Sequence, residues 1–196
     1  MTTTDPKNPD RRVILTTTVV VGGAGLAATA VPFVASMAPS ERARAVGAPV
    51  EVDLSGMKLG ELRTAAWRGQ PIFVLRRSAE MLTSLSRHDQ LLADPQSNRS
   101  IQPTYAKNTD RSINPEYGVL IGICTHLGCI PTYRPKPGAA DIGADWPGGF
   151  YCPCHGSKFD LAGRVFKNVP APTNLVIPSY RFANDKSLLI GVDPKS

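Results

Sequence analysis

The residues most able to do chemistry in this chain are its four cysteines and two of its three histidines. They gather in two short segments: 124–129 reads CTHLGC, and 152–157 reads CPCHGS. Each segment offers one Cys and one His at close spacing, together with one further Cys. Thiolates and imidazoles are the ligands of zinc and of some iron–sulfur clusters, so the sequence predicts a metal centre built from two loops.

The ligand spacing separates these two kinds of centre. Structural zinc sites usually pair like ligands, as C-x₂₋₄-C and H-x₃₋₅-H. Here each segment pairs unlike ligands, and two such loops can each give a sulfur to one iron and a nitrogen to the other. The spacing therefore favours a 2Fe–2S cluster, one per chain, over a single zinc ion, which stays the alternative. The predicted metal ligands are Cys124, His126, Cys152 and His155.

This ligand set has an electrostatic consequence. By formal counting, two thiolates leave an oxidised 2Fe–2S core roughly neutral, whereas four give it a charge of about −2. A neutral centre accepts an electron more readily, and this type spans about −150 to +300 mV against about −400 mV for the all-Cys form. Each ligating imidazole also keeps a second nitrogen that can hold a proton. Uptake of an electron and a proton is thereby coupled, which suits a quinol as the donor.

The paired loops resemble those of the Rieske iron–sulfur proteins. With one extra cysteine in each loop, the arrangement resembles more specifically the membrane-bound Rieske subunit of the bacterial quinol:cytochrome c reductase (cytochrome bc) complex. The resemblance implies a disulfide between Cys129 and Cys154 that clamps the two loops, with two free thiols as the alternative. A disulfide needs an oxidising compartment.

The resemblance also assigns roles around the cluster. His126 and His155 are expected at the exposed tip as the catalytic residues, with His155 accepting a hydrogen bond from quinol. The segment 169–175 resembles the family's proline loop, although family members usually have Gly where Val169 stands. The residues expected to lie against the cluster are Leu127, Gly128, Gly156, Ser157, Phe159, Pro170 and Pro172.

Two of these residues bear on the redox potential. In the family, a Ser at the position of Ser157 donates a hydrogen bond to a bridging sulfide, and a Tyr two residues later donates to a ligand sulfur. This chain has Phe159 instead of that Tyr. Because hydrogen bonds to sulfur favour the reduced cluster, the missing donor predicts a lower potential than in Tyr-bearing relatives.

The N-terminal segment predicts export and membrane attachment. Residues 1–12 are polar and end in Arg11-Arg12, and residues 13–38 carry no charge, about 39 Å as a helix. Paired arginines before a weakly apolar run are typical of a twin-arginine signal, with a plain anchor as the alternative. Cleavage after Ala38 is the competing interpretation, but Pro39 is expected to obstruct it. Residues 39–49 have the composition of a tether, which the family uses as a hinge.

Residues 50–196 form one expected domain, a Rieske-type antiparallel β-sandwich with a small cluster-binding subdomain at about 122–174. The whole chain has 18 Pro and 17 Gly residues, which fit short strands joined by turns. A turn is expected at Gly69-Gln70. The predicted strands are Val50–Asp53, Leu62–Trp67, Pro71–Arg77, Gly118–Cys124, Gly149–Cys152 and Ser187–Val192.

One helix is expected among these strands. Ser78 is its predicted N-cap, and an apolar stripe runs through Met81 and Leu85 to His88 and Leu92. On that stripe His88 is predicted to pack or face solvent rather than to bind metal. The segments 94–115 and 133–149 are expected to be loops, the latter a surface excursion rich in Pro and Gly.

The net charge of +6 is spread along the chain and forms no basic stripe with stacking aromatics, so nucleic-acid binding is not expected. The resemblance implies an electron-transfer subunit of a quinol–cytochrome-c reductase, an oxidoreductase and translocase of the respiratory chain acting on ubiquinol or a related quinol. Its expected partners are a cytochrome b subunit and a c-type cytochrome subunit, in a dimeric complex. The expected location is the bacterial inner membrane, single-pass, with the N-terminus cytoplasmic and the Rieske domain periplasmic.

Two other functions stay open at this point. The small Rieske subunit of a periplasmic molybdenum oxidase, such as arsenite oxidase, can also carry a twin-arginine signal but needs no swinging tether. A non-redox zinc module is the third possibility. The tether-like stretch favours the quinol complex.

Overall fold

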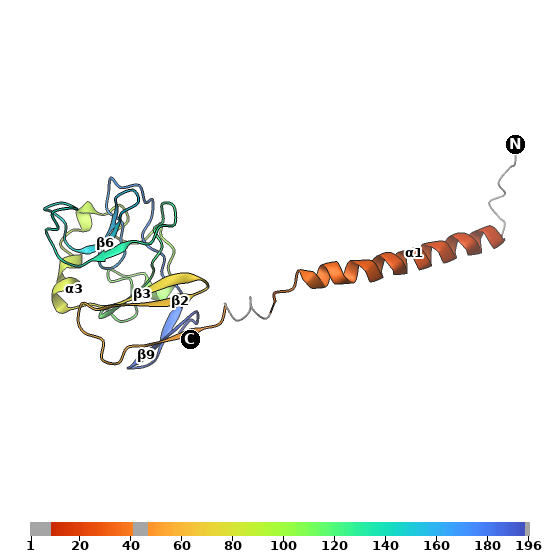
Figure 1. The fold of residues 1–196 in the computed structure, drawn as a ribbon, viewed down its shortest axis with the longest axis horizontal. Helices are drawn as coiled ribbons and strands as arrows, with labels where there is room; N and C mark the ends of the chain where they lie inside the picture. The colour runs from red at the N-terminus through yellow and green to blue at the C-terminus, as the bar shows by residue number, and fades with distance from the viewer. Residues whose placement is uncertain (1–8, 41–46, 195–196) are drawn as a thin grey trace. The chain divides into compact units, whose positions relative to one another are not determined.

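The computed structural model describes residues 9–40 and 47–194. The chain divides into two compact units, residues 1–45 and residues 46–196. Figure 1 shows a long helix in the first unit and a β-rich domain in the second.

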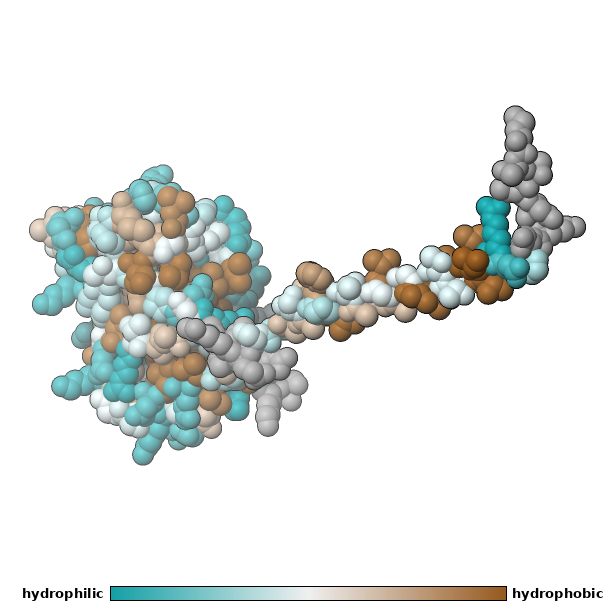
Figure 2. Space-filling view, turned by 45° about the vertical axis from the view of Figure 1, so that its right-hand side comes forward, coloured by the Kyte–Doolittle hydropathy of each residue, from teal (hydrophilic) through white to brown (hydrophobic). Residues whose placement is uncertain are grey.

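The helix of the first unit, α1, spans Pro9–Ser36 and has no buried residue. It is about 42 Å long, and an 18-residue window within it has a mean hydropathy of 1.8, so the helix is long and apolar enough to cross a membrane. On the face that Figure 2 shows, the strongly hydrophilic (dark teal) residues of this helix lie at its N-terminal end. The hydroxyls of Thr16, Thr18 and Thr29 donate to carbonyls one turn earlier, so these polar groups are satisfied within the helix. The helix begins four residues before the predicted segment 13–38 and ends two residues before its end.

Between residues 47 and 194, three antiparallel sheets of three strands each make up the domain. The first sheet has the order β1-β9-β8, the second β2-β3-β4, and the third β5-β6-β7. The mainly antiparallel β prediction is therefore confirmed. The strands are β1 Val50–Asp53, β2 Leu62–Trp67, β3 Gln70–Arg76, β4 Tyr117–Ile121, β5 Thr132–Arg134, β6 Gly149–Cys152, β7 Ser157–Phe159, β8 Tyr180–Asn184 and β9 Ser187–Ile190.

The first hairpin corrects one predicted turn. Trp67 pairs with Gln70, so the two-residue loop is Arg68-Gly69 and Gln70 already belongs to β3. Both loop residues have positive φ, 52° and 73°, as the tightest hairpin turns require. Strands β5, β7 and β8 were not predicted.

Strand β4 ends at Ile121, earlier than the predicted end at Cys124. The next residue, Gly122, still donates to the Pro71 carbonyl at 2.7 Å, but the Cys124 amide instead donates to the Cys129 carbonyl at 2.7 Å. The backbone thus leaves the sheet to close a loop on itself. Cys124 lies in that loop and not in the strand.

Helix α3 spans Ala79–Leu85, and Ser78 caps it by accepting the Met81 amide at 3.3 Å. The apolar stripe continues to Leu92, but the helix does not. His88 is buried and lies 3.3 Å from an Asp160 carboxylate oxygen, while Leu92 pairs with Phe166 across an isolated bridge. These tertiary contacts replace the last turns of the predicted helix, and the predicted packing role of His88 is confirmed. Two short 3₁₀ turns follow, at Asp89–Leu91 and Thr104–Ala106.

One continuous core links the second and third sheets. Phe73 of β3 stacks on Phe150 of β6 with ring centroids 5.5 Å apart. The segment 133–149, expected to be a surface excursion, begins inside β5 and buries Trp146 against Phe166 and Leu92. A second small apolar cluster therefore packs this segment against the domain, contrary to that expectation.

Candidate metal centre

Two loops with the same backbone closure present the cysteines and histidines. The first follows β4, and the second connects β6 to β7. In the first loop the Gly128 amide donates to the Cys124 carbonyl at 3.0 Å, and in the second the Gly156 amide donates to the Cys152 carbonyl at 3.0 Å. Both glycines have positive φ, 83° and 76°, which a side chain would disfavour. A Gly four residues after each Cys is therefore needed to close the turn.

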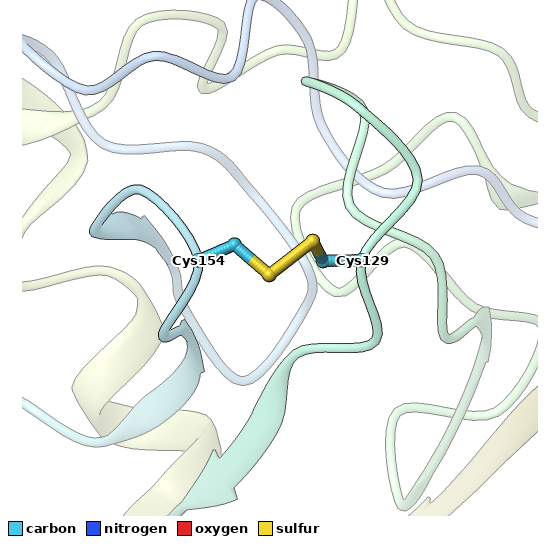
Figure 3. Close-up of a disulfide and its surroundings, with 2 residues drawn as sticks. All are labelled: Cys129 and Cys154. Carbon is cyan, nitrogen blue, oxygen red and sulfur yellow. A yellow bond between two sulfur atoms is a disulfide. The ribbon is translucent and has the colours of Figure 1, made fainter.

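The structure sorts the four cysteines into two kinds. Cys124 and Cys152 are buried and are not joined to another cysteine. Cys129 and Cys154 form a disulfide that links the two loops, with Cα atoms 6.7 Å apart (Figure 3). The sulfurs of Cys129, Cys152 and Cys154 lie within 4.8 Å of one another. Two of these sulfurs are bonded to each other, so this trio does not form a three-thiolate site, and Cys152 stays available as a ligand beside the disulfide.

The two histidines of the motifs meet at the same place. The rings of His126 and His155 are edge to face, with centroids 4.8 Å apart. His155 is exposed and His126 is half-buried. Within the part of the chain that the structure describes, the buried Nδ1 of His126 has no hydrogen-bond partner. A buried nitrogen without a partner is costly unless it binds a metal.

The buried thiols fit the same interpretation. Burial, and secondarily contact with the Cys124 thiol, raises the pKa of Cys152. Two thiolates side by side in such a place require a positive charge between them. Two buried thiols, one unpartnered imidazole nitrogen and one exposed imidazole are a donor set that fits a 2Fe–2S cluster with mixed ligands.

The proline loop contacts both ligand loops. The Thr125 hydroxyl of the first loop donates to the Thr173 carbonyl at 2.7 Å. The Ala171 amide donates to the hydroxyl oxygen of Ser157, at the end of the second loop, at 3.1 Å. Ser157 is fully buried and, since it accepts from Ala171, keeps its own proton free to donate.

The turn into the proline loop does not need glycine at residue 169. The left-handed residue there is Asn168, with φ 59°, and Val169 is absent from the positive-φ residues of the described chain. Asn tolerates this conformation better than a β-branched residue does. Pro170 and Pro172 are exposed on the loop, whereas Ala171 between them is buried.

An exposed apolar patch lies on the first loop. Leu127 is 70% exposed, and Ile130 is 56% exposed. Gly128 between them is also exposed. Leu127 and Gly128 were predicted at this site from the sequence, whereas Ile130 was not, although its place directly after Cys129 could have suggested it. Thr125 was also missed, because only the folded chain brings it to Thr173.

Phe159 lies in β7, fully buried. Alternate residues of a strand point to the same face, so Phe159 shares the face of Ser157. A hydroxyl group added to this ring would therefore lie on the same side of the strand as the Ser157 hydroxyl.

Comparison with known proteins agrees with this geometry. A family described as "Rieske [2Fe-2S] domain" matches residues 49–181. A second family, described as "Ubiquitinol-cytochrome C reductase Fe-S subunit TAT signal", matches residues 1–40.

Two relatives match nearly the whole chain. The "Ubiquinol-cytochrome c reductase iron-sulfur subunit" of Allochromatium vinosum is 61% identical over 93% of this chain and 88% of its own length. The protein of the same name from Blastochloris viridis is 39% identical over 97% of this chain and 98% of its own length. A solved chain titled "Hyperthermophilic respiratory Complex III" aligns with a TM-score of 0.48 and 26% identity, over 86% of this chain and 94% of that one. With two buried thiols and two imidazoles brought together by a disulfide-linked pair of loops, and with a family match covering most of its length, this chain belongs to the Rieske [2Fe–2S] family.

Proposed function

We propose that this protein is the Rieske 2Fe–2S subunit of a quinol:cytochrome c reductase. It takes one electron and one proton from quinol and passes the electron to a c-type cytochrome subunit. The observation that carries the proposal is the exposed imidazole of His155, which lies edge to face with His126 and follows the buried Cys152 by three residues in the same loop. The 61% identity to a ubiquinol-cytochrome c reductase iron-sulfur subunit over 93% of the chain supports it.

Four side chains hold the cluster in this proposal: Cys124, His126, Cys152 and His155. When bound, the cluster supplies a one-electron acceptor of comparatively high potential. The disulfide Cys129–Cys154 keeps the two ligand loops together, and the proline loop with Pro170 and Pro172 covers them from a third side.

The exposed residues of the site bind and orient the quinol. His155 accepts a hydrogen bond from a quinol hydroxyl and takes its proton at the ring nitrogen that is free of metal. Leu127 and Gly128 offer an apolar surface against the cytochrome b subunit and exclude water from the docked site. The Ser157 hydroxyl donates a hydrogen bond toward the cluster. Gly156 in the second loop and Phe159 in β7 lie beside the cluster.

The remaining parts of the chain serve attachment and reach. Residues 13–38 are a retained single-pass anchor in the bacterial inner membrane, with residues 1–12 in the cytoplasm and residues 50–196 in the periplasm. The match of residues 1–40 to a TAT signal of this subunit supports export through the twin-arginine route. Residues 39–49 act as the hinge, and positions 41–46 of it lie outside the described residues. On the domain side, Trp67 Nε1 donates to the Ala48 carbonyl at 3.1 Å, which supports a hinge that ends near this residue.

Electron paramagnetic resonance of the ascorbate-reduced protein in its native membrane tests the proposal. The expected signal has a mean g value below 2, and an inhibitor of the quinol site is expected to change it. The chain is also expected to co-purify with haem b and haem c. A zinc-only protein without this signal, or co-purification with a molybdenum enzyme in place of the haems, would overturn the proposal.

A further inference from the structure

A buried polar network lies directly behind the proline loop, and Asn174 is its centre. Asn174 is fully buried. Its Oδ1 accepts the Val165 amide at 2.8 Å, and its Nδ2 donates to the Asp94 carbonyl and the Ser97 hydroxyl, both at 3.0 Å. Its backbone amide donates to the Ser100 hydroxyl at 3.0 Å. Each polar atom of the side chain is thus bonded to chain segments outside the proline loop.

Asp94 organises the opposite side of this network. Its carboxylate accepts the amides of Asn98 and Arg99 at 2.8 and 3.0 Å and the Ser100 hydroxyl at 2.7 Å. Ser100 therefore donates to Asp94 and accepts from Asn174 with one oxygen. This hydroxyl bridges the segment 94–100 to the end of the proline loop.

Arg111 closes the base of the same loop. Its Nη2 donates to the Leu175 carbonyl at 2.8 Å, and its Nη1 donates to the Ala162 and Gly163 carbonyls at 3.0 and 3.3 Å. The Leu175 amide also donates to the Gly163 carbonyl at 2.8 Å. The segment 163–175 is thus a loop whose two ends are joined at a buried base.

The residues just before Asn174 reach the two ligand loops from this base. Thr173 accepts from Thr125 of the first loop, and Ala171 donates to Ser157 of the second. Because Thr173 is adjacent to Asn174, the position of Asn174 limits where both contacts can form. We propose that Asn174 and Ser100 are positioning residues, which hold the proline loop against both ligand loops and so over the cluster. The inference rests on the ligand loops of the proposed function, but on no step of electron transfer.

Substitution of Ser100→Ala in the full chain, assembled in its membrane complex, tests this role. The change removes the bridging hydroxyl and leaves the Asn174 side chain in place. Hydrogen exchange of the backbone amides in segment 166–173 is expected to accelerate about three- to tenfold, the factor for about one net hydrogen bond. Exchange in the hairpin of β2 and β3 is expected to stay unchanged. The g values of the reduced centre are expected to shift, and Ser100→Thr, which keeps the hydroxyl, is expected to restore both readouts.

Ser112→Ala is the matched control. Ser112 is buried, whereas Ser100 is half-buried, and the Ser112 hydroxyl accepts from Arg77 Nη2 at 2.8 Å, but it has no bond to the proline loop among the described residues. Its substitution is expected to leave exchange in segment 166–173 and the g values unchanged. The inference is wrong if Ser100→Ala leaves segment 166–173 unchanged, accelerates the β2–β3 hairpin equally, or gives the same result as Ser112→Ala.

A harsher variant, Asn174→Ala, removes three side-chain bonds at once, and Ser100→Ala decides the question if that variant does not assemble. Neither readout requires turnover. If Ser100→Ala shows the expected exchange pattern but the complex with the native chain does not oxidise quinol, the proposed function is refuted and this inference stands.

Discussion

The rings of His126 and His155 meet edge to face at 88°, although they come from different loops. The pair is not symmetric, because His155 is exposed and His126 is half-buried with its Nδ1 enclosed. The His155 imidazole is thus open to a docked molecule, while the His126 imidazole is partly covered and has its Nδ1 enclosed. This asymmetry is the structural reason to assign quinol contact to His155.

The Phe159→Tyr variant is expected to have a higher midpoint potential. Phe159 shares a strand face with Ser157, so a hydroxyl there can donate to a ligand sulfur and favour the reduced centre. A hydrogen bond of about 1 kcal/mol corresponds to roughly 40 mV for one electron. A redox titration followed by electron paramagnetic resonance measures the shift. Phe182→Tyr, in β8 of another sheet, is the control; an unchanged or lowered potential in Phe159→Tyr would refute the hypothesis.

Replacing both Cys129 and Cys154 by Ser is expected to loosen the pair of ligand loops while leaving the four proposed ligands intact. The disulfide spans a sequence separation of 25, for which the loss of the crosslink costs about 3 kcal/mol. For a chain of this size that corresponds to a thermal midpoint lower by ~10 °C. Loss of visible absorption on heating measures the effect, and addition of a disulfide reductant to the native protein should imitate it. Equal thermal midpoints would show that the clamp is not needed.

The Asp160→Asn variant is expected to be less stable at neutral pH and to approach the native protein in acid. Burial by itself would raise the pKa of Asp160, but the hydrogen bond with His88 and the charge of Arg164 outweigh burial and lower it. A carboxyl whose folded pKa lies below its unfolded value stabilises the fold above the unfolded pKa, near 4, and loses that contribution as the pH falls through the folded pKa.

The cost at pH 7 is about 3 kcal/mol, because the fully buried Arg164 loses the buried one of its two carboxylate partners and keeps only the part-exposed Asp89. Thermal unfolding between pH 3 and pH 8 measures the difference between the variants. Asp141→Asn removes an exposed partner of Arg134 and should change little at any pH. A difference that stays constant across this pH range would contradict the linkage to Asp160.

The Leu127→Ala variant is expected to slow quinol oxidation without loss of the cluster. The side chain is 70% exposed and contributes to docking in the proposed function, so its removal takes away apolar contact with the partner subunit. We expect a several-fold lower rate of cytochrome c reduction with an unchanged spectrum of the reduced centre. Leu59→Ala, at a leucine that is 61% exposed outside the ligand loops, is the control. Equal rates for the two variants would remove Leu127 from the docking surface.

Much of the site is predictable because its chemistry is local in the sequence. Cys124 and His126 are two residues apart, Cys152 and His155 are three apart, and a Gly closes each turn. Strand β6 and the hairpin of β2 and β3 were predicted nearly residue by residue, since their patterns depend only on near neighbours. The end of the helix after Leu85 was not, because contacts of His88 with Asp160 and of Leu92 with Phe166 override the apolar stripe.

The sequence by itself determined the residue types of the proposed ligands, their unlike pairing and the apolar N-terminal helix, since each of these depends on residues within one turn or one run. Only the tertiary structure decided that Cys124 and Cys152 are buried and unbridged, that the rings of His126 and His155 touch, and that Asn174 lies on the segment 94–100. Those relationships join residues far apart in the chain through irregular loops, which have no hydrophobic period to announce them. Their geometry is set by which buried polar groups must find partners once the core has formed.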